Sequence, residues 1–135
     1  MKIYFAGAIR GGREKADTFA KIADELEKHG EILDKHVANP NVNELEANRP
    51  FEEIYQRDIN WIKECDIVVA EVSTPSLGVG YEISYAEHLG KKIVCLCDET
   101  ARVSAMIGGN NKLELIRYKD DDDLIIKLKE IFKNS

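Results

Sequence analysis

The sequence predicts a doubly wound α/β fold, in which a five-stranded parallel sheet is sandwiched between helices. Short apolar runs alternate along the chain with longer segments whose apolar residues recur every three or four positions. This alternation of strand and helix is typical of a parallel sheet with helical crossovers, as in Rossmann-like and flavodoxin-like proteins. The chain has 135 residues, which is the length of one domain, and we assign residues 1–135 to it.

The individual elements follow from the positions of the apolar runs and of the residues that interrupt them. Strands are expected at residues 3–6, 31–33, 66–72, 92–97 and 113–118. Helices are expected at residues 14–28 and 50–64, around Glu82 as far as residue 89, and at residues 124–132. Residues 39–50 form a polar connection, with room for a short helix near residues 44–47, and we expect it to act as a mobile lid.

Composition excludes several classes of function. A formal net charge of −6 argues against a protein that binds nucleic acid polymers, because such proteins usually carry a basic face. No apolar run approaches the roughly 20 residues that a membrane-spanning helix requires. The three cysteines include Cys95 and Cys97, which share one face of an expected strand and are predicted to be buried thiols. We therefore expect a reduced cytoplasmic protein that needs no membrane, metal or cofactor.

In doubly wound sheets, ligands bind outside the carboxyl ends of the strands, at the point where the strand order reverses. The loops that follow the first four strands should therefore meet at one crevice. These loops are residues 7–13, 35–39, 73–80 and 98–104. The fold predicts where the site lies, but the chemistry must come from the side chains there.

Two of these loops carry residues that suit an anion. The first loop has Arg10 and Arg13 around a pair of glycines, and an arginine can bind phosphate oxygens in bidentate fashion. Its pattern matches neither a Walker loop nor a dinucleotide fingerprint, so it could equally be a solvated loop. The turn through Ser76, Gly78 and Gly80 leads into a helix, whose free N–H groups and dipole favour a phosphate.

Asp58 and Glu82 are the carboxylates that could carry out a reaction. Cleavage of a glycosidic bond uses two carboxylates at one crevice, one acting at the anomeric carbon and the other handling protons. Each residue has an ordinary alternative, since Asp58 could be an exposed helix residue and Glu82 could serve the helix dipole. Tyr4 could position the nucleophile or lie in the core. His36 follows the second strand, where a lone histidine is more often structural.

These residues lie in stretches that resemble the 2'-deoxynucleoside 5'-phosphate N-hydrolases of the nucleoside 2-deoxyribosyltransferase superfamily. The most specific are Gly-Ala-Ile-Arg-Gly-Gly-Arg at 7–13 and Pro-Ser-Leu-Gly-Val-Gly-Tyr-Glu at 75–82. Shorter matching stretches are residues 4–6, 56–61, 70–72 and 103–107. The resemblance covers nearly the whole chain.

The resemblance implies hydrolysis of a deoxynucleoside monophosphate to a free base and 2-deoxyribose 5-phosphate. It makes Glu82 the nucleophile of a covalent intermediate, Asp58 the proton donor and Tyr4 the residue that holds Glu82. The phosphate would be bound by Gly7, Ala8, Ile9, Arg10, Gly11, Ser76 and Gly78.

The resemblance also implies a homodimer, in which Ser104 and Met106 of one protomer complete the site of its partner. Ser104 has a second interpretation, as the N-cap of a short helix. Where the family has a phosphate-binding serine this chain has Ala8, so one hydroxyl donor is lost. A deoxyribosyltransferase and a non-catalytic nucleotide-binding module are the alternative functions.

Overall fold

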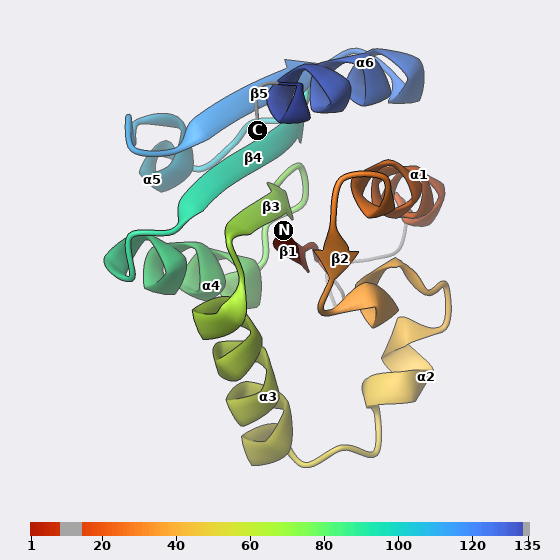
Figure 1. Cartoon of the computed structure of the whole chain (residues 1–135), viewed down its shortest axis with the longest axis vertical. Coiled ribbons are helices and arrows are strands. Elements are labelled where there is room, and N and C mark those ends of the chain that lie inside the picture. The colour runs from red at the N-terminus through yellow and green to blue at the C-terminus, as the bar shows by residue number, and fades with distance from the viewer. Residues whose placement is uncertain (9–14, 134–135) are drawn as a thin grey trace.

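The computed structural model describes residues 1–8 and 15–133, and in them a five-stranded parallel sheet forms the centre of the molecule (Figure 1). The strand order is β2-β1-β3-β4-β5, which is the flavodoxin-like order and reverses between β1 and β3. The strands are β1 (Lys2–Ala6), β2 (Glu31–Ile32), β3 (Ile67–Glu71), β4 (Lys92–Asp98) and β5 (Glu114–Tyr118). The predicted fold class is confirmed.

Helices cover both faces of the sheet. The longer helices are α1 (Ala16–Glu27), α3 (Phe51–Glu64), α4 (Leu77–His88) and α6 (Asp121–Phe132). The shorter ones are the 3-10 helix η1 (Lys35–Ala38), α2 (Val42–Glu46) and α5 (Ala105–Gly108). Helices α1 and α6 pack together on one face, while α3 and α4 supply the other hydrophobic layer (Figure 1).

Alternation along β1 divides its side chains between these two layers. Ile3 and Phe5 are fully buried against α1 and α6. Tyr4 and Ala6 point the opposite way and pack with the α3–α4 layer. Because successive side chains of a strand alternate between faces, this register places the Tyr4 hydroxyl on the side of the sheet that contains the cavity described below.

The start of α4 differs from the prediction. The sequence placed Gly78 and Gly80 in a turn, but both lie in the first turns of a helix that begins at Leu77. Ser76 is its N-cap, and the Ser76 Oγ accepts a hydrogen bond from the Val79 N–H at 3.3 Å. The cap and the burial of Val79 against the sheet compensate for the low helix propensity of glycine. Glu82 consequently lies in the second turn, not the first.

Two other boundaries moved by a few residues. The short helix expected near residues 44–47 is α2, which begins at Val42, a side chain with no exposed surface. The last helix begins three residues earlier than expected, because the Asp120 carboxylate caps it by accepting from the Asp123 N–H at 2.8 Å. The first apolar residue of the helix predicted a start at residue 124, whereas the Asp120 N-cap sets the start at Asp121.

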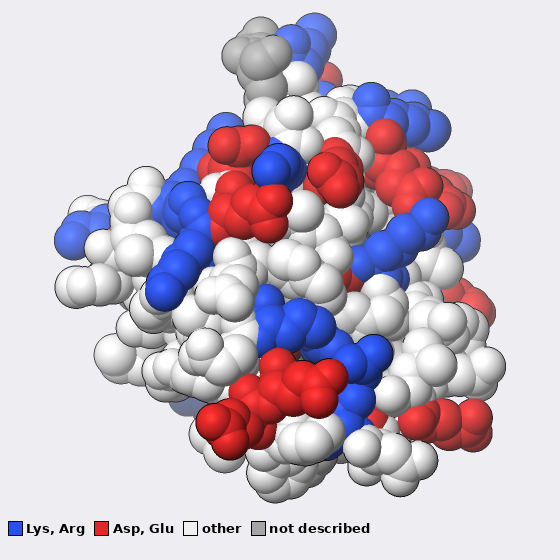
Figure 2. Space-filling view, turned by 60° about the horizontal axis from the view of Figure 1, so that its bottom comes forward, with Lys and Arg blue, Asp and Glu red and all other residues white. Residues whose placement is uncertain are grey.

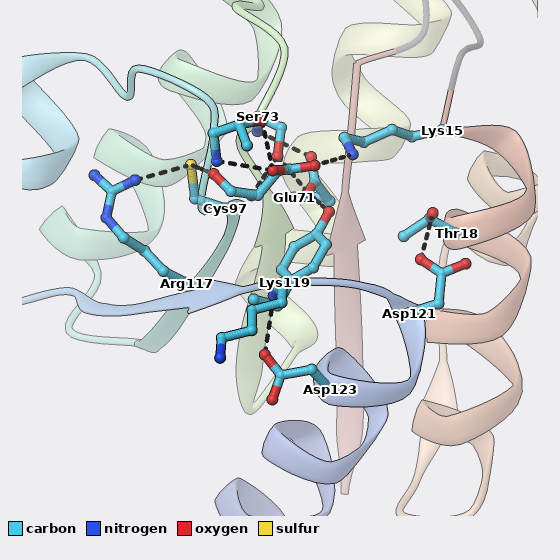
Figure 3. A network of polar contacts seen from close by, with 12 residues as sticks. Lys15, Thr18, Glu71, Ser73, Cys97, Arg117, Lys119, Asp121 and Asp123 are labelled. Atoms are coloured by element: carbon cyan, nitrogen blue, oxygen red, sulfur yellow. Dashed lines mark hydrogen bonds and ion pairs between the residues drawn. The ribbon is translucent and has the colours of Figure 1, made fainter.

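A buried carboxylate ties together the carboxyl ends of β3, β4 and β5 (Figure 3). Glu71 is 2% exposed and accepts hydrogen bonds from the Ser73 N–H at 2.9 Å, the Ser73 hydroxyl at 2.7 Å and the Tyr118 hydroxyl at 2.5 Å. The Ser73 Oγ in turn accepts from the Asp98 N–H at 2.8 Å. The network fixes the beginning of the segment that leads to the N-cap of α4.

Glu71→Ala is therefore expected to lower the free energy of unfolding by about 3 kcal/mol, because it leaves buried donors without an acceptor. Glu114→Ala, which removes an exposed carboxylate from β5, is the control and should change it by less than about 0.5 kcal/mol. Urea denaturation followed by circular dichroism measures both values. Equal effects of the two substitutions would contradict a stabilising role for the network.

The surface charges and the helices of the described residues bear on two classes of function that the composition argued against, nucleic-acid binding and membrane insertion. On the face shown in Figure 2, Lys and Arg side chains are interspersed with Asp and Glu, and no broad basic field covers the described residues there. None of the helices in the described ranges combines the length and the apolar character that a membrane span requires.

Candidate active site

A cavity of about 830 Å³ opens at the carboxyl ends of β1 and β3, next to the reversal of strand order. It lies where the fold class predicts a ligand. Its walls come from β1, η1, α2, α3 and the first turns of α4, so residues far apart in the sequence face one space. Tyr4, Asp58, Ser76 and Glu82, all singled out from the sequence, line it together.

Tyr4 and Glu82 form a hydrogen-bonded pair inside this cavity. The Tyr4 hydroxyl donates to the Glu82 Oε2, and Tyr4 itself is 2% exposed. Burial raises the pKa of Glu82 to about 7, and the charge of Asp58 adds to this rise. The Tyr4 hydrogen bond and the charge of Arg57 oppose the rise. Burial and the nearby carboxylates raise the pKa of Tyr4 well above its usual value, so its hydroxyl remains a donor at neutral pH.

Asp58 reaches the same cavity from the middle of α3. Its side chain is 25% exposed, and its Oδ1 accepts a hydrogen bond from the Arg57 Nε at 3.0 Å. Burial raises the pKa of Asp58 and outweighs the opposing effect of Arg57. The cavity therefore contains two carboxyl groups whose pKa values are raised toward neutral pH. Carboxyl groups with raised pKa values are suited to exchange protons with a substrate.

A second polar cluster, which we name the Arg57 cluster, consists of His36, Glu46 and Arg57 and lines the same cavity. The Glu46 Oε1 lies 2.9 Å from the Arg57 Nη2 and 2.8 Å from the His36 Nε2. Burial, together with the charge of Arg57, lowers the pKa of His36 and favours the neutral imidazole. The cluster joins α2 and η1 to α3.

The sequence assigned no role to Arg57 or Glu46, and it left open whether His36 reaches the crevice, where it does lie, or is only structural. These residues meet because the connection that contains α2 brings Glu46 within 2.9 Å of Arg57 on α3, and no periodic pattern encodes the path of that connection. The one signal available was the position of Arg57 beside Asp58 in a helix that was already expected to face the crevice.

The predicted anion-binding residues are only partly described. Gly7, Ser76 and Gly78 line the cavity, and Ala8 is buried. A Cβ on Gly7 would lie 2.7 Å from the Phe19 ring, so packing against Phe19 favours a glycine there. Ile9, Arg10 and Gly11 lie outside the described residues.

Ser104 and Met106 do not line the cavity of their own chain. Ser104 is the N-cap of α5, and its Oγ accepts from the Met106 N–H at 3.2 Å. Both side chains are exposed, Met106 to 81%. Of the two interpretations of Ser104, the structure shows the N-cap, and it leaves these side chains available to a neighbouring molecule.

Comparison with known proteins connects this geometry to a family. A family model described as nucleoside 2-deoxyribosyltransferase matches residues 3–130. A Nematostella vectensis protein, provisionally named 2'-deoxynucleoside 5'-phosphate N-hydrolase 1, is 44% identical over 128 residues, which cover 90% of this chain and 87% of that protein. A 5-hydroxymethyl-dUMP N-hydrolase of Rattus norvegicus is 47% identical over 111 residues, covering 79% of this chain and 68% of that protein.

Solved structures support the fold. The structure described as Clostridium botulinum CMP N-glycosidase, BcmB, superimposes with a TM-score of 0.75 at 24% identity and covers 97% of this chain and 99% of that one. The match of the family model over nearly the whole chain, together with relatives well above 30% identity, confirms the resemblance found in the sequence. The chain belongs to the nucleoside 2-deoxyribosyltransferase family.

Proposed function

We propose that the protein hydrolyses the N-glycosidic bond of 2'-deoxynucleoside 5'-monophosphates, giving a free nucleobase and 2-deoxyribose 5-phosphate. The observation that carries this proposal is the placement of Glu82, its hydrogen-bond donor Tyr4 and a second carboxylate, Asp58, in one cavity. The names of two relatives, a 2'-deoxynucleoside 5'-phosphate N-hydrolase and a 5-hydroxymethyl-dUMP N-hydrolase, support the same substrate class.

In the first step the ionised Glu82 attacks C1' of the deoxyribose. A bond forms between C1' and a carboxylate oxygen, the C1'–N bond breaks, and its electron pair leaves with the base. Because the Tyr4 hydroxyl holds the Oε2, the Oε1 is the attacking atom. Asp58, whose pKa burial raises, gives its proton to the departing base.

In the second step water releases the sugar. Asp58, now a carboxylate, takes a proton from a water molecule whose oxygen attacks C1', and the bond to Glu82 breaks. The Glu82 carboxylate is regenerated, and Asp58 is protonated again for the next cycle. Two displacements at C1' retain the configuration of the sugar.

The 5'-phosphate is bound at the N-terminus of α4. Ser76 and Gly78 stand at that end of a 12-residue helix and line the cavity, where N–H groups and the helix dipole favour an anion. In our proposal the loop after β1 contributes the remaining contacts, from Gly7, Ala8, Ile9, Arg10 and Gly11.

A homodimer is part of the same proposal, with Ser104 and Met106 of the partner subunit completing each site. Two observations support the homodimer. Helix α5 is exposed, and four exposed apolar side chains line the mouth of the cavity and form an apolar rim: Phe51, Tyr55, Leu77 and Tyr81. Exposed apolar groups of this kind mark association surfaces. We also place the enzyme in the cytoplasm, since its cysteines are buried free thiols.

Two matched glycine substitutions test the phosphate site. Around Gly78, the nearest side-chain atom to an added Cβ is the Ser76 Oγ at 4.0 Å, and around Gly80 nothing lies within 4 Å. Both alanine variants should therefore fold with equal or slightly higher stability. Gly78→Ala should raise the KM for the monophosphate by about tenfold, because its methyl group occupies the space of the phosphate, whereas Gly80→Ala should not. Steady-state kinetics distinguish them, and equal KM values would place the phosphate elsewhere.

The function itself is tested by incubating the protein with each deoxynucleoside monophosphate, the matching ribonucleotide and the unphosphorylated nucleoside. Chromatography then measures the released base. We expect release from the deoxynucleoside monophosphates above all. No release from any of them would refute the hydrolase, and equal release from nucleosides would refute the phosphate assignment. Exchange with an added second base would favour the deoxyribosyltransferase instead.

A further inference from the structure

We propose that Arg57 is a further catalytic residue, whose guanidinium binds an acceptor atom of the leaving nucleobase and stabilises the negative charge that the base acquires as the C1'–N bond breaks. This inference rests on the proposed function and adds a residue that neither the sequence motifs nor the relatives' names assign to the reaction.

Arg57 is the one lysine or arginine among the described residues that line the cavity. It shares that space with three carboxyl groups, those of Glu46, Asp58 and Glu82. The histidine of the lining, His36, does not add a second cation at neutral pH, because burial and the charge of Arg57 lower its pKa. Any negative charge that forms inside the described walls therefore has Arg57 as its nearest permanent countercharge.

Contacts on two sides hold the guanidinium in place. Its Nε donates to the Asp58 Oδ1 at 3.0 Å, and its Nη2 donates to the Glu46 Oε1 at 2.9 Å. The guanidinium carbon also lies 4.9 Å from the centre of the Trp61 ring, within the range of a cation–π contact. A planar group fixed by two carboxyl groups and a ring is preorganised, so it loses little freedom when it binds a ligand.

The third nitrogen is still available. Arg57 Nη1 donates a hydrogen bond to none of the described residues, although its side chain is only 19% exposed and lines the cavity. The residue therefore presents unused N–H donors on a mostly buried cation. Donors of this type bind carbonyl oxygens and ring nitrogens, and these are the acceptor atoms of a nucleobase.

The position of Asp58 places these donors near the leaving base. In the proposed first step Asp58 hands its proton to the base, and the Arg57 Nε lies 3.0 Å from the Asp58 Oδ1. A base close enough to receive that proton is within reach of the same guanidinium. The electron pair of the broken C1'–N bond then spreads onto acceptor atoms that face a fixed cation, and the charge is stabilised whether or not proton transfer is complete.

The test varies the acidity of the leaving base while keeping the sugar and phosphate constant. The substrates are 2'-deoxyuridine 5'-monophosphates with fluorine, bromine, hydrogen or methyl at position 5 of the base. The proteins are the parent chain, Arg57→Gln, Arg57→Lys and the control Arg49→Gln, which removes an exposed arginine that pairs with Glu53 at 2.9 Å. Rapid-quench measurement under single turnover gives the rate of base release, and circular dichroism verifies folding.

Arg57→Gln is expected to slow release of the poorest leaving base by about a hundredfold and release of the most acidic base by much less. The rate then depends more steeply on leaving-base acidity than in the parent. Arg57→Lys keeps the charge without the planar fork, so its slope should lie between the two. Arg49→Gln should match the parent.

A uniform slowing of all four substrates by Arg57→Gln, or a slope unchanged from the parent, overturns the inference and leaves the hydrolase intact. If Arg57→Gln does not fold, an unchanged slope in Arg57→Lys has the same meaning. If the parent chain releases base from none of the substrates, the proposed function fails, and the role of Arg57 fails with it.

Discussion

Glu82→Gln is expected to slow base release by roughly ten thousandfold, as is usual when a covalent nucleophile is removed. The amide cannot form the bond to C1', although it has nearly the same shape and can still meet the Tyr4 hydroxyl as an acceptor. Nucleotide binding should stay within a few-fold of the parent, because the substitution leaves the proposed phosphate contacts at Ser76 and Gly78 unchanged. Rapid-quench kinetics measure the rate, and calorimetric titration with a deoxynucleoside monophosphate measures the affinity.

Glu87→Gln is the matched control for this variant. Glu87 lies on the same helix, but its carboxylate accepts from the Asn110 side chain at 2.5 Å and does not line the cavity. Its rate should equal that of the parent. Should Glu82→Gln retain full activity, another group must be the nucleophile. A parent chain that binds nucleotides but never releases base would instead be the non-catalytic binding module.

Tyr4→Phe should shift the pH dependence of the reaction. In the proposed reaction Glu82 must be ionised to attack, and burial raises its pKa to about 7, so its protonation removes the nucleophile as the pH falls below that value. The Tyr4 hydrogen bond opposes this rise. Without that bond the pKa of Glu82 moves higher, and the acid limb moves with it. We expect a loss of about thirtyfold near pH 6 that becomes smaller above pH 8.

Measuring kcat/KM between pH 5 and 9 tests this expectation, with Tyr118→Phe as the control. Tyr118 is also a buried tyrosine that donates to a buried glutamate, but its partner is Glu71, outside the cavity. Its removal should affect stability and leave the pH profile of activity unchanged. The same loss at every pH in Tyr4→Phe would show that the hydroxyl positions Glu82 without tuning its ionisation.

Much of this architecture was predictable because the sheet imposes strong patterns on the chain. The run at residues 67–71 is buried throughout, and the location of the cavity follows from the strand order. The start of α4 was not predictable from periodicity, because Gly78 and Gly80 resemble turn residues and only the Ser76 cap shows that a helix has begun. The glycines favour a turn at this point, whereas the Ser76 cap and the burial of Val79 favour a helix, and a helix forms.

The candidate site was predictable in part. Tyr4, Asp58 and Glu82 meet because each lies on a regular element whose direction follows from the fold. The contacts of Arg57 with Glu46 depend on the path of an irregular connection between β2 and α3. Such a path is determined by side-chain contacts that form only after the core is assembled, so no local pattern in the sequence reports it.

The attachment of α2 has a consequence for how the substrate range can diverge. In this helix the side chain of Val42 is fully buried, and the carboxylate of Glu46 forms an ion pair with Arg57 of α3. Neither of these residues belongs to the sheet that holds Tyr4 or to the helices that hold Asp58 and Glu82. Replacements within residues 39–50 that keep Glu46, the partner of Arg57, can therefore reshape this wall of the cavity while Tyr4, Asp58 and Glu82, the residues of the proposed reaction, keep their positions. The chemistry can be inherited unchanged as base preference evolves.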